Sequence, residues 1–459
     1  MNEIIVIGGG LAGSEAALQI AKRKIKVKLY EMKPNKFSGA HSNKNLGEIV
    51  CSNSFKSNLV TNACGLLKEE LRLLGSFLIP IADRVAVPAG QALAVDRERF
   101  AEEVTKEVEN NEYIEIVREE VKKIPSDSIA IVATGPLTSE DLSKEILRIT
   151  GENKLFFYDA ASPIIEKESI DMNIAFYGNR YDEERGREED ELEWRDRIKD
   201  IDASYINLPM NKEEYEDFVK ELSSAEVVLL HDFEKREIFE GCMPIEIMAS
   251  RGIDTLRYGP LKPVGFTDPR TARRPYAVVQ LRQDNSEGIL YNMVGFQTNL
   301  KYGEQKRVFS MIPGLKNANF VKYGVMHRNT YINSPKLLDN TYKLRGKNIF
   351  FAGQLTGVEG YVESIASGYV ASQNAIKLFD LIYNNGDIEK YKDIKVVFPN
   401  ETIIGALATY ISTDRDEFQP MNANFGIIPE LAEKIRDKKE RYQKFADRSL
   451  NLIKSLVEK

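Results

Sequence analysis

Residues 3–13 read Glu-Ile-Ile-Val-Ile-Gly-Gly-Gly-Leu-Ala-Gly, and this stretch decides the fold of the 459-residue chain. Its apolar run has no alternation of apolar and polar residues, which is typical of a parallel strand buried on both faces. Residues 13–24 are rich in alanine and predict a helix, and residues 27–31 predict a second strand. Together they make one βαβ unit, so we expect an α/β protein.

Three glycines in this stretch, Gly8, Gly10 and Gly13, have the G-x-G-x-x-G spacing of a dinucleotide-binding turn. Gly8 allows the tight turn, Gly10 lets the backbone approach a pyrophosphate, and Gly13 lets the helix pack on the strand. The N-terminus of the helix then offers N–H groups and a positive dipole to the phosphates. The second strand ends in an acidic residue suited to bind ribose hydroxyls. We predict that the first half of the cofactor site consists of Gly8, Gly9, Gly10, Leu11, Ala12, Gly13 and Glu31.

A second strand–turn–helix pattern near residue 350 separates FAD from NAD as the cofactor. Residues 348–353 predict a strand and residues 363–379 a helix, while residues 128–135 predict another strand that ends at a glycine. In flavoproteins with two dinucleotide-binding motifs, such a turn brings backbone N–H groups to the flavin end, and a simple dehydrogenase has no use for it. We therefore predict FAD, held at this end by Gly353, Gln354, Thr356, Gly357, Glu359, Gly360 and Tyr361.

The βα pattern is interrupted in the middle of the chain, which indicates an insertion. Short strand-like runs and proline-rich turns occupy residues 161–330. We predict a two-dinucleotide-binding-type, Rossmann-like FAD domain in two parts, residues 1–160 and 331–459, with an inserted α+β domain at residues 161–330. Residues 429–459 predict a charged amphipathic helix at the end of the second part.

The composition argues against a membrane protein, a secreted protein and a metal site. Mean hydropathy is −0.35, and the chain lacks the ~20-residue apolar run of a membrane span and any signal peptide. The cysteines Cys51, Cys64 and Cys242 show no C-x-x-C spacing, and the three histidines stand apart from other candidate ligands. We expect a cytoplasmic protein with reduced thiols and no metal.

The charge distribution is uneven, with an acidic segment at residues 182–200 and a basic segment at residues 257–282. A net charge of −7 argues against a typical nucleic-acid binder. A basic face on an acidic chain is still compatible with RNA, although such a run equally describes a solvated surface. The candidate RNA-binding residues are Arg270, Arg273, Arg274 and Arg282.

These motifs resemble the bacterial folate- and FAD-dependent tRNA (uracil-5-)-methyltransferases, the TrmFO family, over nearly the whole chain. The blocks around Cys51 and Cys242, residues 50–54 and 239–246, are the most specific to that family. The other matching blocks are residues 8–15, 30–32, 87–90, 94–97, 259–265 and 352–368. The resemblance implies that the chain makes 5-methyluridine at position 54 of the T-loop of tRNA. It implies 5,10-methylenetetrahydrofolate as the carbon donor, reduced flavin as the reductant and NADPH or NADH as its source. No stable protein partner is inferred.

The implied chemistry requires a cysteine that adds to uracil C6 and a base that removes the C5 proton. We assign the addition to Cys242, whereas Cys51 either removes the C5 proton or handles the methylene at the flavin, and the reverse assignment stays open. Either thiol needs nearby positive charge to ionise near neutral pH, and Lys56 is the candidate beside Cys51. Without the resemblance, both cysteines are as well explained as small buried residues. Cys64 is expected to pack under the helix that follows it, and Tyr361 either stacks on a cofactor or belongs to the core.

Four other functions are compatible with parts of the sequence. A wobble-uridine-modifying flavoprotein shares the glycine motifs but carries a long helical domain after them, for which the 99 residues after Gly360 are too few. The same chemistry on ribosomal RNA would use the same residues. A small-molecule FAD oxidoreductase and a non-catalytic RNA-binding flavoprotein are the remaining alternatives.

Overall fold

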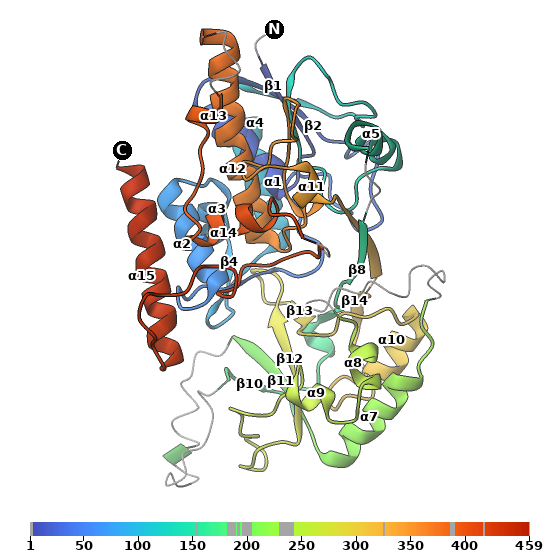
Figure 1. The fold of residues 1–459 in the computed structure, drawn as a ribbon. Coiled ribbons are helices and arrows are strands. Elements are labelled where there is room, and N and C mark those ends of the chain that lie inside the picture. Colours follow the sequence, from blue (N-terminus) through green and yellow to red (C-terminus); the bar gives the residue numbers. More distant parts are fainter. Residues whose placement is uncertain are drawn as a thin grey trace.

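The computed structural model describes residues 3–151, 155–180, 190, 193–194, 204–228, 243–324, 326–385, 391–415 and 418–458. Two bodies are visible, one built on a parallel sheet and one on an antiparallel sheet (Figure 1). Most of the acidic segment, together with Cys242, lies outside the described residues. Among the described residues, no helix is long and apolar enough to cross a membrane.

The parallel sheet has the strand order β16-β7-β1-β2-β6, and each neighbouring pair is parallel. Strand β1 is central, with β2 on one side and β7 on the other, so the strand order reverses beside β1. In sheets of this kind, ligands bind beyond the carboxyl ends of the strands at this reversal. The strands are β1 (Glu3–Ile7), β2 (Lys26–Tyr30), β6 (Ile114–Val117), β7 (Ile129–Val132) and β16 (Ile349–Phe351).

The first and last parts of the chain form one body because two helices pack directly on each other. Helix α1 follows β1, and α12 follows β16. A side chain at Gly368 of α12 would lie 2.2 Å from the carbonyl oxygen of Ala12, so glycine permits this close contact. The helices of this body are α1 (Leu11–Lys22), α2 (Ala63–Leu74), α3 (Leu78–Arg84), α4 (Arg97–Glu109), α5 (Glu140–Thr150), α11 (Ser334–Leu337), α12 (Tyr361–Asp380), α13 (Tyr391–Ile394), α14 (Ile403–Tyr410) and α15 (Lys438–Val457).

A small antiparallel sheet in the same body carries the residues that follow Cys51. Its order is β3-β5-β4, with β3 at Ser54–Ser57, β4 at Ala86–Val87 and β5 at Ala92–Val95. Helix α2 begins soon after β3, and the Asn62 side chain caps it by accepting a hydrogen bond from the Cys64 amide.

The second body is an antiparallel sheet of order β10-β11-β12-β13-β9-β14 with its own apolar core. Its strands are β9 (Ile164–Glu166), β10 (Phe176–Tyr177), β11 (Tyr205–Met210), β12 (Ala277–Gln283), β13 (Leu290–Met293) and β14 (Phe320–Lys322). Its helices are α7 (Lys212–Ser224), α8 (Ile245–Ser250), α9 (Thr255–Tyr258) and α10 (Tyr302–Phe309).

The two bodies are joined by an antiparallel strand pair, β8 (Leu155–Ala160) with β15 (Met326–Tyr331). The α/β class and the Rossmann-like parallel sheet are confirmed. The expected domain boundaries, 160/161 and 330/331, fall at or within these connecting strands, and as domain limits they stay predictions. The C-terminal helix begins at Lys438 rather than near residue 429, and it packs beside α2 (Figure 1).

Candidate functional site

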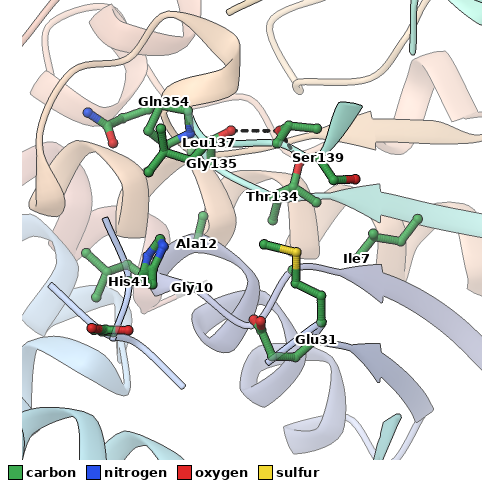
Figure 2. Close-up of a pocket in the computed structure, with 18 of the residues that line it drawn as sticks. Ile7, Gly10, Ala12, Glu31, His41, Thr134, Gly135, Leu137, Ser139 and Gln354 are labelled. Carbon is green, nitrogen blue, oxygen red and sulfur yellow. Dashed lines mark hydrogen bonds between the residues drawn. The ribbon is translucent and has the colours of Figure 1, made fainter. Parts of the chain in front are cut away.

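A pocket opens at the carboxyl ends of β1, β2, β7 and β16. Figure 2 shows Glu31 and Ile7 on one side and Gln354 and His41 on the other, with Gly10 and Ala12 between them. The predicted cofactor residues that line the pocket are Gly8, Gly10, Leu11, Ala12, Glu31, Gly353, Gln354 and Tyr361. The two halves predicted from distant parts of the sequence therefore meet in one cavity.

The glycines of the first turn meet different steric demands. Gly8 has φ +103°, and a Cβ there would lie 2.6 Å from the carbonyl oxygen of Ala133. A Cβ on Gly13 would lie 1.8 Å from the carbonyl oxygen of Gly8, so this position packs helix against turn. A Cβ on Gly10 would meet no atom within 4 Å, so the bare backbone of this residue faces open space in the pocket. This is the arrangement that a closely approaching pyrophosphate requires.

The carboxylate of Glu31 is fixed at the edge of the pocket by the turn itself. It accepts hydrogen bonds from the Gly9 amide at 2.9 Å and from the Lys33 amide at 2.9 Å. Two amide donors leave further lone pairs on the carboxylate. Glu31 can therefore also accept from ribose hydroxyls in the pocket.

The remaining predicted residues of the second turn lie outside the lining of the pocket and stabilise the turn. Thr356 is fully buried and donates to the Gly353 carbonyl at 2.9 Å, and a side chain on Gly357 would collide with Phe418. Glu359 accepts a hydrogen bond from the Gln354 side chain at 2.6 Å. Neither these three residues nor Gly9, Gly13 and Gly360 line the cavity.

Cys51 lines the same pocket, in the loop that precedes β3. The hydroxyl of Tyr361 accepts hydrogen bonds from the backbone amides of Cys51, at 3.0 Å, and Ser52, at 3.1 Å. Burial raises the pKa of Tyr361, so this hydroxyl stays protonated. Tyr361 thus lines the pocket and holds the cysteine loop, a role that its position in the sequence does not reveal.

Two lysines bear on the positive charge expected beside Cys51. Lys56 forms an ion pair with the buried carboxylate of Glu363 at 3.5 Å. Lys322 of β14 is near enough to Cys51 for the two charges to interact. Burial and the neighbouring Arg97 lower the pKa of Lys322, whereas Glu48, Asp284 and Cys51 oppose that change. Lys322 lies far from residue 51 in the sequence, so no local pattern points to it.

Cys64 is only 2% exposed, and its thiol lies 3.5 Å from the Phe55 carbonyl. Burial raises the pKa of Cys64 to about 12, because the thiolate would lose its hydration. Cys64 is therefore buried as expected, but it lies in the first turn of α2 rather than before the helix. It is not suited to act as a nucleophile.

The basic loop before β12 presents three of the four arginines proposed for RNA. Arg270, Arg273 and Arg274 are exposed, and the guanidinium of Arg270 donates two hydrogen bonds to Asp268, at 3.0 and 2.7 Å. Arg282 is different, because it is only 7% exposed and donates to Ser52 and Asn53. This burial argues against the predicted contact between Arg282 and RNA. Arg282 is a basic residue of the same segment, but the strand turns it inward.

The pocket also includes residues that the motifs did not indicate. His41 and Glu48 come from the long connection after β2, and Asn329 comes from β15. Burial and the nearby Lys33 lower the pKa of His41, so the neutral imidazole is favoured. Among the described residues, no three His, Cys, Asp or Glu side chains are grouped so as to hold a metal ion.

Comparison with known proteins identifies the family. The model of the family "Glucose inhibited division protein A" matches residues 3–380. A methylenetetrahydrofolate--tRNA-(uracil-5-)-methyltransferase TrmFO of Acetivibrio thermocellus is 58% identical, covering 100% of this chain and 99% of that one. The chain belongs to the TrmFO family. A second TrmFO, from Ligilactobacillus salivarius, is 54% identical over 98% of this chain and 97% of that one.

The TrmFO family shares its fold with a solved structure of much lower sequence identity. GidA of Aquifex aeolicus superposes with a TM-score of 0.67 at 16% identity. The match covers 99% of this chain and 73% of the GidA chain. At this identity the likeness supports the fold alone, and it agrees with the Rossmann-like body described above.

Proposed function

We propose that this chain methylates C5 of a uridine in tRNA, with methylenetetrahydrofolate as the carbon donor and FAD as the cofactor. The observation that carries the proposal is the pocket in which Cys51 meets both halves of a dinucleotide site. The full-length TrmFO relative, 58% identical, supports the same activity. A tRNA substrate places the reaction in the cytoplasm, and position 54 of the T-loop is the proposed target.

The residues of the pocket fit FAD. Gly10 would leave room for the pyrophosphate, Glu31 could accept from the ribose hydroxyls, and the turn at Gly353 would hold the flavin end. When bound, FAD supplies the hydride that reduces the transferred carbon to a methyl group. NADPH or NADH is the proposed source of that hydride.

Cys51 is proposed as the base that removes the C5 proton of the uracil. It lines the pocket, and the hydroxyl of Tyr361 accepts a hydrogen bond from its backbone amide. Lys322 and Arg97 provide positive charge around its loop, which favours the thiolate. Cys242, outside the described residues, is the proposed nucleophile at C6. Addition of a thiolate at C6 makes C5 nucleophilic enough to take up the one-carbon unit.

The exposed arginines of the loop before β12 are proposed to bind tRNA phosphates. A stacked uridine must leave the helix to reach a buried pocket, so the protein has to hold the backbone on both sides of it. Arg270, Arg273 and Arg274 lie on the antiparallel-sheet body, at the start of a strand whose other end contacts the Cys51 loop. Phosphate contacts there position the RNA without reading its bases.

The direct test is nucleoside mass spectrometry of unmodified tRNA after incubation with the enzyme, labelled methylenetetrahydrofolate and NADPH. Label in 5-methyluridine is expected, and it should vanish when the folate is omitted. A parallel reaction with ribosomal RNA separates the two RNA substrates. NADPH oxidation with no labelled nucleoside in either RNA would favour a small-molecule oxidoreductase instead.

A further inference from the structure

The loop at residues 50–53, which carries Cys51, is held by residues from three different parts of the chain. Arg97, at the start of α4, donates to the Val50 carbonyl at 2.9 Å. Tyr361, at the start of α12, accepts from the amides of Cys51 and Ser52. These contacts fix the backbone of the loop, and the side-chain amide of Asn53 also donates to the Val95 carbonyl of β5 at 3.1 Å. A third element, far along the chain, also binds the side chains of residues 52 and 53.

That third element is β12 of the antiparallel sheet. Arg282 donates through Nε to Oδ1 of Asn53 and through Nη2 to Oγ of Ser52, both at 2.9 Å. The side-chain amide of Asn53 in turn donates to the carbonyl of Gln283, the next residue of β12, at 2.9 Å. The guanidinium of Arg282 and the backbone carbonyl of Gln283 therefore form hydrogen bonds with two consecutive residues, Ser52 and Asn53, beside Cys51.

The chemistry of this contact points to precise placement more than to stability. Arg282 is only 7% exposed, and burying a guanidinium is costly unless all its donors find partners. The nearby carboxylate Asp284 is already paired with Arg97 at 3.0 Å, so Arg282 bonds mainly to neutral acceptors. An apolar side chain would pack as well at lower cost. What an arginine adds is a rigid fork that sets the direction of two hydrogen bonds.

We propose that Arg282 is a positioning residue that sets Cys51 in register with the RNA-bearing sheet. The inference rests on the proposed function, in which Cys51 acts on a uracil held by that sheet. Strand β12 starts at Ala277, three residues after Arg274, and reaches Arg282 near its other end. One strand thus connects the exposed arginine loop to the cysteine loop. Loss of the hydrogen bonds from Arg282 to Ser52 and Asn53 therefore displaces the Cys51 thiol relative to the RNA.

The test compares Arg282→Met and Arg282→Lys in the FAD-loaded enzyme, with Arg148→Met as the matched control. Arg148 is an exposed arginine of α5, whose side chain is 70% exposed. A displacement of about 1 Å costs about 100-fold in rate, so kcat for tRNA methylation should fall by that order in Arg282→Met. KM for tRNA and the FAD content should stay at the wild-type values. Arg282→Lys keeps the charge but loses the fork, so it should not restore kcat.

A second readout does not depend on methylation. The rate at which iodoacetamide alkylates Cys51, followed by peptide mass spectrometry, should rise several-fold in both variants and stay unchanged in the control. Wild-type kcat with wild-type alkylation of Cys51 would overturn the proposal. Raised KM for tRNA with unchanged alkylation would overturn it too, because Arg282 would then act on RNA. If the wild type methylates no tRNA, the proposed function fails, while alkylation still reports on the loop.

A variant of Ser52, the partner of Arg282, serves as the control for misfolding. If Arg282→Met does not retain FAD, Ser52→Ala removes one acceptor of the same contact without leaving a buried guanidinium alone. The double variant Ser52→Ala with Arg282→Lys should lose no more activity than the more affected single variant, because both changes break one contact. Fully additive losses would contradict the assigned contact.

Discussion

In the parallel sheet the strands end at one edge, whereas in the antiparallel sheet neighbouring strands end at opposite edges. The parallel sheet therefore collects its turns into one pocket, with backbone from Gly8, Gly10 and Gly353 as the binding surface. The antiparallel sheet contributes side chains from the body of a strand, such as Arg282, to a loop of the other body. A binding surface made of backbone atoms is blocked by any added side chain. A contact between side chains depends instead on the identity of a partner residue far away in the sequence.

The largest effect is expected from the glycines of the parallel sheet. Gly10→Val should abolish FAD binding in a folded protein, because the new side chain enters open pocket space. Gly13→Val should prevent folding, because its Cβ would lie 1.8 Å from the Gly8 carbonyl oxygen. Flavin absorbance and circular dichroism of the purified variants distinguish the two outcomes. Full FAD occupancy in Gly10→Val would contradict the pocket assignment.

The next effect concerns the cysteines. Cys51→Ala and Cys242→Ala should each lose methylation by several orders of magnitude, since each removes a group needed for a whole step. Cys64→Ala should keep nearly full activity, because its thiol is buried and protonated. Initial rates of label transfer to tRNA measure all three variants.

The two cysteine roles separate with RNA that carries 5-fluorouridine, whose fluorine does not leave as a proton does. Cys51→Ala should still form a covalent adduct with this RNA, and Cys242→Ala should not. Denaturing gels and peptide mapping detect the adduct. The reverse pattern would exchange the roles, and an adduct on neither cysteine would refute both.

A smaller effect is expected from buried carboxylates, such as Glu70 in the parallel-sheet body and Glu246 in the antiparallel-sheet body. Glu70 accepts from the amides of Ile403 and Ile404 and from Ser449, which joins α2 to α14 and α15. Burial raises the pKa of Glu70 from 4.5 to about 7. The folded state then holds a proton that the unfolded state has released, so the free energy of unfolding falls as pH rises from 4.5 to 7.

Between pH 4.5 and pH 7, the free energy of unfolding falls by roughly 3 kcal/mol at most because of this proton. Glu70→Gln should remove this dependence, measured as the difference between wild-type and variant denaturation midpoints at pH 5 and pH 7. Glu246→Gln applies the same test to the antiparallel body, because burial also raises the pKa of Glu246. If the denaturation midpoints of the wild type and of Glu70→Gln change in parallel between pH 5 and pH 7, folding does not raise the pKa of Glu70.

The smallest effect is expected for RNA binding at the antiparallel sheet. Replacing Arg270, Arg273 and Arg274 together by alanine should lower the slope of log affinity against log salt by about 2 to 3, or 0.7 to 0.9 per phosphate contact. Filter binding at several salt concentrations measures it. Arg282→Met should leave the slope unchanged, because its guanidinium lies inside the protein. An unchanged slope in the triple variant would move the RNA site elsewhere.

The parallel-sheet region was predictable because its signals are local. The G-x-G-x-x-G turn follows β1 directly, and steric limits on Gly8 and Gly13 act within a few residues. The second turn near Gly353 has the same strand–turn–helix pattern, so both halves of the site were predictable from short stretches. The start of the last helix was misplaced by about nine residues, because residues 429–437 share its polarity but not its regular structure.

Side-chain roles that depend on packing were not predictable in this way. Arg282 and Arg274 are both basic residues of one segment, yet only the pairing of β12 within the sheet decides which is buried. Lys56 lies five residues from Cys51 and pairs with Glu363, whereas Lys322, 271 residues away in the sequence, is near enough for its charge to interact with Cys51.

By itself, the sequence determined the α/β class, the two glycine turns and the membership of Cys51 in a family-specific block. Those features depend on backbone sterics and short spacings, which hold wherever the chain goes. Only the tertiary structure decided that Tyr361 holds the Cys51 loop and that Arg282 grips it from another sheet. Such hydrogen bonds join residues more than 200 positions apart, and a linear pattern carries no information on which distant partners folding brings within 3 Å.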